Sequence, residues 1–211
     1  MTIKKNWKTL LITSLVILLP IVAGLILWDQ LPDKIPMHWG PSGEVDGWGS
    51  KPFFVFGIPA LMLVFQWLMV LGTQADTKKK NHAPQMVSLV LWIVPVLQIM
   101  LTTITYMTAL GHPVRVEIVI PVFMGILLAI VGNYMPKCKQ NYTIGIKIPW
   151  TLDSEENWNK THRMAGWTWT IGGVLIAAIA FLGNWWIPFV ILMIMTTIPI
   201  VYSYLLYRKG I

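Results

Sequence analysis

The residues best suited to chemistry near the start of the chain lie in one loop, residues 29–51. His38, Glu44 and Asp46 are close in sequence there, and imidazole and carboxylate groups can bind metal ions or transfer protons. Their spacing matches no established ligand set, so a recognition surface and an interfacial cap stay open as alternatives. We predict no metal and no cofactor. The candidate recognition residues are His38, Trp39, Gly43, Glu44, Asp46, Gly47, Trp48 and Lys51.

A second candidate site is the segment 137–163, called the polar island because apolar runs flank it on both sides. A connection this long inside a compact protein is usually functional or disordered. Disordered segments are poor in aromatic residues, whereas the island carries Tyr142, Trp150 and Trp158. We therefore expect a folded cap.

The local pattern of the island predicts a short strand followed by a helix. Apolar and polar residues alternate loosely over 141–149, which is typical of an extended segment. Asp153 with Glu156 three residues later predicts a helix N-cap. The helix should run from Ser154 past His162 into the next apolar run.

Within the island we expect Trp150 and Trp158 to be substantially buried and His162 to bond to a loop residue, either Asn141 or Thr151. No nucleophile–base pair stands out, so we predict no catalytic residue and no enzymatic activity. A purely structural cap, with Lys147 paired to a carboxylate, is the alternative. The candidate residues are Asn141, Gly145, Lys147, Pro149, Trp150, Thr151, Trp158 and His162.

The composition indicates a membrane protein. The 211 residues are 55% hydrophobic and 12% charged, about half the charge of a typical soluble domain. Six apolar stretches reach the roughly 20 residues that a spanning helix needs. They are Leu10–Trp28, Phe53–Thr73, Met86–Leu110, Val114–Met135, Ala165–Leu182 and Trp185–Tyr207. The first stretch is too long for a signal peptide and lacks a cleavage site.

The basic residues predict how the chain is oriented. If the six stretches span the membrane, 13 Lys and Arg residues fall on one side and three on the other. Basic residues favour the cytoplasmic side, so both termini and the island should be cytoplasmic and loop 29–51 should face outward. This also accounts for the net charge of +7 as topology signals and lipid contacts. We predict no nucleic-acid partner.

The remaining segments suggest little chemistry. The spans carry no charge near their middles, which counts against an ion-driven pump, and no internal repeat of the transporter kind is visible. Loop 74–85, with three consecutive lysines, is interpreted as a solvated topology loop. We expect an all-α, polytopic membrane protein with an ordered outer loop and a folded cytoplasmic loop, divided into residues 1–73 and 74–211.

Two motifs resemble known families. The stretch from Asn141, N-x-x-x-G-I-K-x-P-W-T-L, followed by W-x-K-T-H-R from Trp158, resembles the signature of the SdpI family of bacterial membrane proteins. The stretch L-P-D-K-I-P-x-H-W from Leu31, with G-x-x-D-G-W-G-S-K-P from Gly43, resembles the DUF1648 domain that begins many of those proteins. One departure is Lys147, where the family usually has Arg and its bidentate fork.

The resemblance implies a six-span protein of the bacterial plasma membrane. The namesake of the family protects its producer against a secreted peptide toxin and also holds a transcriptional repressor at the membrane. The expected partners are therefore membrane lipid, a peptide toxin on the outer side and a cytoplasmic repressor. A small transporter or channel, or a membrane enzyme using His38 or His162 with nearby carboxylates, stays open as the alternative.

Overall fold

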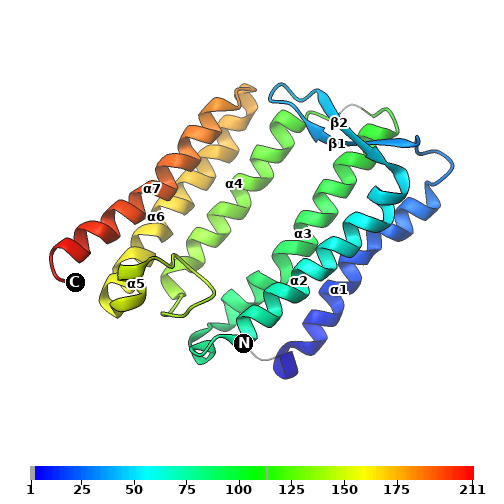
Figure 1. Ribbon diagram of the computed structural model, residues 1–211. Coiled ribbons are helices and arrows are strands. Elements are labelled where there is room, and N and C mark those ends of the chain that lie inside the picture. The colour runs from blue at the N-terminus through cyan, green and yellow to red at the C-terminus, as the bar shows by residue number, and fades with distance from the viewer. Residues whose placement is uncertain (1–2, 113) are drawn as a thin grey trace. The chain divides into compact units, whose positions relative to one another are not determined.

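The structure is a computed structural model that describes residues 3–112 and 114–211 (Figure 1). Within this part of the chain, six helices are long and apolar enough to cross a membrane. The predicted all-α membrane architecture is confirmed. The six helices are α1 (Ile3–Ile26), α2 (Ile58–Ala75), α3 (Pro84–Ala109), α4 (Val116–Tyr134), α6 (Glu155–Ile179) and α7 (Trp186–Arg208).

Shorter elements lie between the spanning helices. The first loop forms an antiparallel hairpin of two strands, and the island contains the short helix α5. The π-helical turn η1 leads directly into α2, and three 3-10 turns lie near the ends of other helices. These elements are β1 (Lys34–Trp39), β2 (Val45–Ser50), η1 (Phe53–Gly57), η2 (Lys79–Asn81), η3 (Met135–Lys137), α5 (Pro149–Asp153) and η4 (Ala180–Leu182).

The chain folds into two compact units, each described on its own below. The hairpin unit contains α1, the β-hairpin, α2 and most of α3. The island unit contains the α2–α3 loop, α4, the island and the helices α6 and α7. The units interleave along the chain, because α3 belongs mainly with α1 and α2 although the loop before it belongs with the island.

Buried polar side chains tie the helices of the hairpin unit together. The Gln66 amide in α2 donates to the Thr13 hydroxyl in α1 at 2.7 Å, and both side chains are buried. The Tyr106 hydroxyl in α3 donates to the carbonyl oxygen of Pro20 in α1 at 3.1 Å. Polar groups away from water need such partners, so these bonds favour one packing of the three helices.

The island unit combines close helix packing with polar docking. A side chain at Gly125 of α4 would overlap the backbone of Gly173 and Ala177 in α6, so only glycine permits this approach. The Asn157 amide of α6 donates to the carbonyl oxygen of Ser203 in α7 at 3.0 Å, and Asn157 is fully buried. Small residues let helix backbones meet closely in a membrane, so α4 lies against α6 along its glycines.

Candidate functional site

The first candidate site is the β-hairpin in the hairpin unit. Lys34 pairs with Ser50 and Trp39 with Val45, with irregular register around His38. The turn between the strands places Gly43 at φ +89°, a conformation that favours glycine. The sequence predicted an ordered loop, which is confirmed. It did not predict strands, because three prolines and four glycines obscure the short alternation.

Apolar and charged contacts anchor the hairpin to the rest of its unit. Leu31 and Ile35 are buried in a cluster with Phe54, Val55 and other apolar residues. Lys51 has only 12% of its side chain exposed, and its ammonium donates to the carbonyl oxygens of Trp28 at 3.1 Å and Leu31 at 2.8 Å. Lys51 therefore holds the hairpin onto the segment that follows α1, rather than lying on the surface.

The outer side of the hairpin presents polar and aromatic groups to the surroundings. His38 contacts Asp46 at 2.5 Å, and Glu44 accepts a hydrogen bond from the Ser42 hydroxyl. Trp48 has 57% of its surface exposed, while Trp39, Gly43 and Gly47 are half-buried. No three His, Cys, Asp or Glu side chains gather into a metal-binding group among the described residues.

The second candidate site is the island, and its first half is organised by the side chain of Asn141. The Asn141 carbonyl oxygen accepts from the backbone N–H groups of Thr143 at 2.9 Å and Ile144 at 2.7 Å. Its amide donates to the carbonyl oxygens of Lys139 at 2.8 Å and Ile144 at 2.9 Å. The predicted strand at 141–149 is wrong, because these bonds curl the backbone around a buried asparagine instead of extending it.

The island continues into α5 and then α6. Pro149 opens α5, a position where proline's missing N–H costs nothing. The predicted N-cap at Asp153 is wrong by one residue, since Asp153 ends α5 and the Ser154 hydroxyl accepts from the N–H of Asn157. Serine is a strong N-cap, and the short helix before it accounts for the shift. The predicted continuous helix from the island into the fifth span is confirmed.

Trp158 and His162 form the centre of the island. Trp158 is fully buried, as predicted, and its ring stacks on His162 with 4.0 Å between ring centroids. The indole N–H donates to the carbonyl oxygen of Cys138 at 2.7 Å. Gly145 has φ +119°, and a side chain there would overlap the His162 ring and crowd the Trp158 ring. The island backbone thus lies directly against this pair of rings.

His162 bonds to the island through both ring nitrogens. Nδ1 lies 2.8 Å from the carbonyl oxygen of Trp158, and Nε2 lies 3.0 Å from the backbone nitrogen of Ile146. The first bond needs a proton on Nδ1 and the second a lone pair on Nε2, which requires the neutral ring. The predicted bond to a loop residue is confirmed, but the partner is the Ile146 backbone rather than Asn141 or Thr151.

Thr151 and Gln140 join the two halves of the island. The buried Thr151 hydroxyl donates to the carbonyl oxygen of Ile146 at 2.8 Å and accepts from the N–H of Ile148 at 3.1 Å. The Gln140 amide donates to the carbonyl oxygens of Thr151 at 2.9 Å and Leu152 at 3.0 Å. These bonds satisfy backbone groups that a loop would otherwise leave unpaired, so the segment has one defined shape.

The α2–α3 loop forms hydrogen bonds with the island, although it lies outside residues 137–163. The Asp76 carboxylate accepts from the Tyr142 backbone N–H at 3.0 Å and the Thr143 hydroxyl at 2.8 Å, and it contacts His82 at 3.0 Å. Lys78 donates to the Gln140 side chain at 2.5 Å. The interpretation of loop 74–85 as a solvated topology loop is wrong, because Asp76 and His82 have fully buried side chains.

The charges of Asp76 and His82, where the α2–α3 loop meets the island, follow from burial and hydrogen bonding. Burial alone would raise the pKa of Asp76, but hydrogen bonds from Thr143, Lys78, His82 and Tyr142 outweigh it and hold that pKa below its ordinary value. Burial lowers the pKa of His82, so its ring is neutral at neutral pH. Asp76 and Thr143 both contact the same nitrogen of His82. These two contacts hold the α2–α3 loop against the island.

The remaining predicted island residues lie at the edges of the cap. Trp150 is half-buried, and its ring lies against Tyr204 and Tyr207 of α7. Lys147 is exposed and donates to the carbonyl oxygen of Thr143 at 2.9 Å, instead of pairing with a carboxylate. Burial raises the pKa of the Cys138 thiol to about 11, so this thiol is unreactive.

Sequence reasoning missed Asp76, Lys78, His82, Gln140 and Asn157. All five join segments far apart in the chain, which local patterns cannot reveal. One signal was available in the composition of loop 74–85. Asp76 is its only acidic residue and lies close to three lysines, which do not need an acidic neighbour in a solvated loop.

The fold and the site define a class: a polytopic α-helical membrane protein with a two-stranded hairpin and a buried polar island. Residues 137–203 match the SdpI/YfhL protein family, and residues 15–63 match a domain of unknown function, DUF1648. The Immunity protein SdpI of Bacillus subtilis (strain 168) is 31% identical over 212 residues, covering 98% of this chain and 97% of the relative. No solved structure matches the chain. The chain belongs to the SdpI/YfhL protein family.

Proposed function

We propose that this protein is an immunity protein of the bacterial plasma membrane that protects its cell against a secreted peptide toxin. The observation that carries the proposal is the similarity to an immunity protein over almost the whole of both chains. The fold adds support, since both polar segments of the chain are ordered rather than simple connectors. We infer no catalytic activity, because the buried groups of the island are occupied by structural bonds.

The hairpin is the proposed surface that meets the toxin. It presents an exposed tryptophan, Trp48, beside the polar pair His38 and Asp46. Exposed aromatic residues next to polar groups are typical of peptide-binding surfaces. The distribution of basic residues supports an outward-facing hairpin, with both termini and the island in the cytoplasm.

The island is the proposed surface for a cytoplasmic partner, in line with a repressor held at the membrane. Its backbone is fixed by Asn141, Thr151 and His162, and α5 contacts α7 through Trp150. A rigid surface of this kind suits recognition, because little conformational entropy is lost when a partner binds.

Survival under toxin tests the proposal. Cells lacking the gene should die when a toxin-secreting strain grows beside them, and expression of the wild-type chain should restore survival. Trp48→Ala should reduce rescue, whereas Trp186→Ala, which removes a tryptophan of similar exposure (56%) at the start of α7, should not. Equal survival with and without the gene contradicts the immunity function. Full rescue by Trp48→Ala contradicts only the hairpin surface.

A further inference from the structure

A groove lies open on the surface between α6 and α7, along the middle of both helices. It has a volume of about 310 Å3 and is lined almost entirely by apolar side chains. Gly172 allows Met195 of α7 to pack against α6, since a side chain at 172 would overlap Met195. Met195 is buried beside the exposed residues Ile171 and Ile194. The groove therefore has a floor and two apolar walls.

Along α6, from the groove toward the island, the side chains change from apolar to aromatic and then to basic. Trp167, at the end of the groove, is 67% exposed, as is typical of tryptophans at a membrane interface. Arg163 lies one turn further and Lys160 two turns further, and both side chains line a second, open cavity. At 1.5 Å per residue, Arg163 lies about 12 Å along the axis from Ile171.

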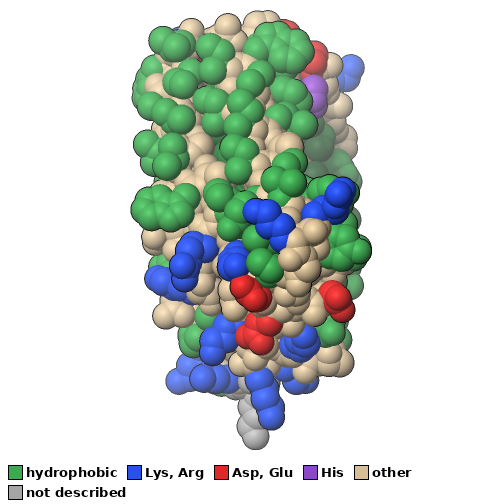
Figure 2. Space-filling model, turned by 90° about the vertical axis from the view of Figure 1, so that its left-hand side faces the viewer, with side chains coloured by type: hydrophobic (Ala, Val, Ile, Leu, Met, Phe, Trp, Pro, Cys, Tyr) green, Lys and Arg blue, Asp and Glu red, His purple; other side chains and the backbone are tan. Residues whose placement is uncertain are grey.

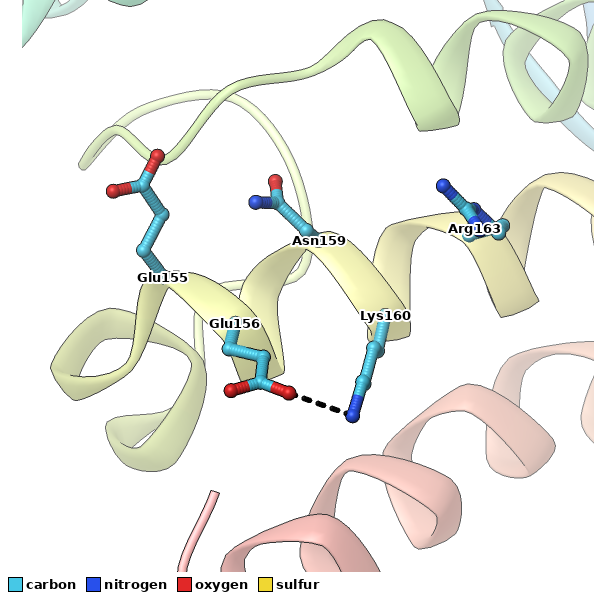
Figure 3. Close-up of a pocket in the computed structure, with 5 residues that line it drawn as sticks. All are labelled: Glu155, Glu156, Asn159, Lys160 and Arg163. Atoms are coloured by element: carbon cyan, nitrogen blue, oxygen red, sulfur yellow. Dashed lines mark ion pairs between the residues drawn. The ribbon is translucent and has the colours of Figure 1, made fainter.

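Acidic residues follow the basic ones. Glu156 contacts Lys160 at 2.8 Å, and Glu155 lines the same cavity. Figure 3 shows Glu156 and Lys160 projecting from a different side of α6 than Glu155, Asn159 and Arg163. Helical periodicity places Lys160 and Glu156 in line with Trp167, so the groove, the cation and the carboxylate follow one another along one side of the helix.

The face of the molecule that carries α6 and α7 shows the same division. In Figure 2, hydrophobic side chains cover the upper part of this face, and Lys, Arg, Asp and Glu side chains gather below them. A phospholipid has a matching order of acyl chain, phosphate and head group. Arg and Lys bind phosphate, and a carboxylate beyond them attracts an amine while it repels a second anion.

We propose that α6 and α7 form a binding site for a phospholipid with an amine head group, such as phosphatidylethanolamine. One acyl chain lies in the groove beside Ile171 and Met195, the phosphate meets Lys160, and the ammonium meets Glu156. The arrangement of charges favours this lipid over phosphatidylglycerol, which has a phosphate but no amine to satisfy the carboxylate.

Photocrosslinking in nanodiscs tests the site. The full-length chain, with a benzophenone amino acid at Ile171, is placed in equal amounts of phosphatidylethanolamine, phosphatidylglycerol and phosphatidylcholine. Mass spectrometry of the adducts should show enrichment of phosphatidylethanolamine. The control places the crosslinker at Val190 of α7, which is exposed but does not line the groove. Adducts there should follow the bulk composition.

Charge variants separate the two halves of the head group. Lys160→Gln should lower total phospholipid adducts at Ile171 about fivefold, with no change at Val190, whereas Arg163→Gln, on a different side of α6, should have a smaller effect. Glu156→Gln should abolish the preference for phosphatidylethanolamine while leaving total adducts unchanged. Melting temperatures confirm that each variant is folded. A bulk-like lipid ratio at Ile171, enrichment of phosphatidylglycerol there, or a crosslinked protein dimer would each overturn the proposal.

Discussion

At the scale of single residues, the island depends on side chains that replace backbone pairing. Asn141 alone makes four hydrogen bonds to the backbone, and Trp158 with His162 supplies the surface on which Gly145 rests. An unpaired polar group in such a site costs more than the bond itself contributed. Substitutions here should therefore affect folding strongly.

Trp158→Ala should lower the free energy of unfolding by about 3–5 kcal/mol, because it removes a fully buried aromatic ring. Trp158→Phe should cost less, since it keeps most of the packing and loses the hydrogen bond to Cys138. Trp150→Ala is the matched comparison at a half-buried tryptophan. Chemical denaturation in detergent micelles measures all three. A loss for Trp158→Ala no larger than for Trp150→Ala would contradict the central role of Trp158.

Lys147→Arg should be tolerated and Lys147→Glu should not. The ammonium donates to the carbonyl oxygen of Thr143, and a guanidinium can make the same bond whereas a carboxylate repels that oxygen. Toxin survival and membrane abundance are the measurements for both variants. Normal survival and abundance with Lys147→Glu would mean that this bond has no part in function.

At the scale of elements, the sequence predicted features that depend on neighbouring residues and missed features that depend on contacts between distant segments. The six spans, the ordered first loop and the helix continuing from the island follow from apolar runs, turn residues and capping signals. The strands and the Asn141-centred loop did not follow, because their short apolar alternations are ambiguous. The contact of the α2–α3 loop with the island joins Asp76 to Thr143, and no local pattern predicts a contact of that sequence separation.

The junction between the α2–α3 loop and the island should loosen in mild acid. Because the pKa of His82 is lowered in the fold, its contribution to stability is complete above the ordinary value of about 6.5 and is lost as pH falls below it. The lowered pKa of Asp76 delays the loss of its contribution to still lower pH. The Tyr142 amide should therefore be less protected from hydrogen exchange at pH 5.5 than at pH 7.5, after correction for intrinsic rates.

The variant His82→Gln is the control for this pH dependence. Glutamine does not titrate, so the protection of the Tyr142 amide should no longer change between the two pH values. An unchanged pH dependence in that variant would assign the effect to a different group.

At the scale of the whole molecule, orientation is the property most open to direct measurement. Ser42→Cys should react with a membrane-impermeant maleimide on intact cells, because Ser42 is exposed in the turn of the hairpin. Lys139→Cys, exposed in the island, should react only after permeabilisation. Native Cys138 is too buried to report on either side. The reverse labelling pattern would invert the predicted topology.

The close approach of α4 to α6 has a consequence for how this chain can vary. Gly125, Gly132 and Gly173 leave no room for a side chain at their contacts, whereas Ile126 and Ile130 on α4 are exposed. In a saturation mutagenesis library, the exposed positions of α4 should accept any apolar residue, and the three glycines should accept almost none. Substitutions in α4 would then be restricted mainly at its glycines, while most of its exposed surface could change.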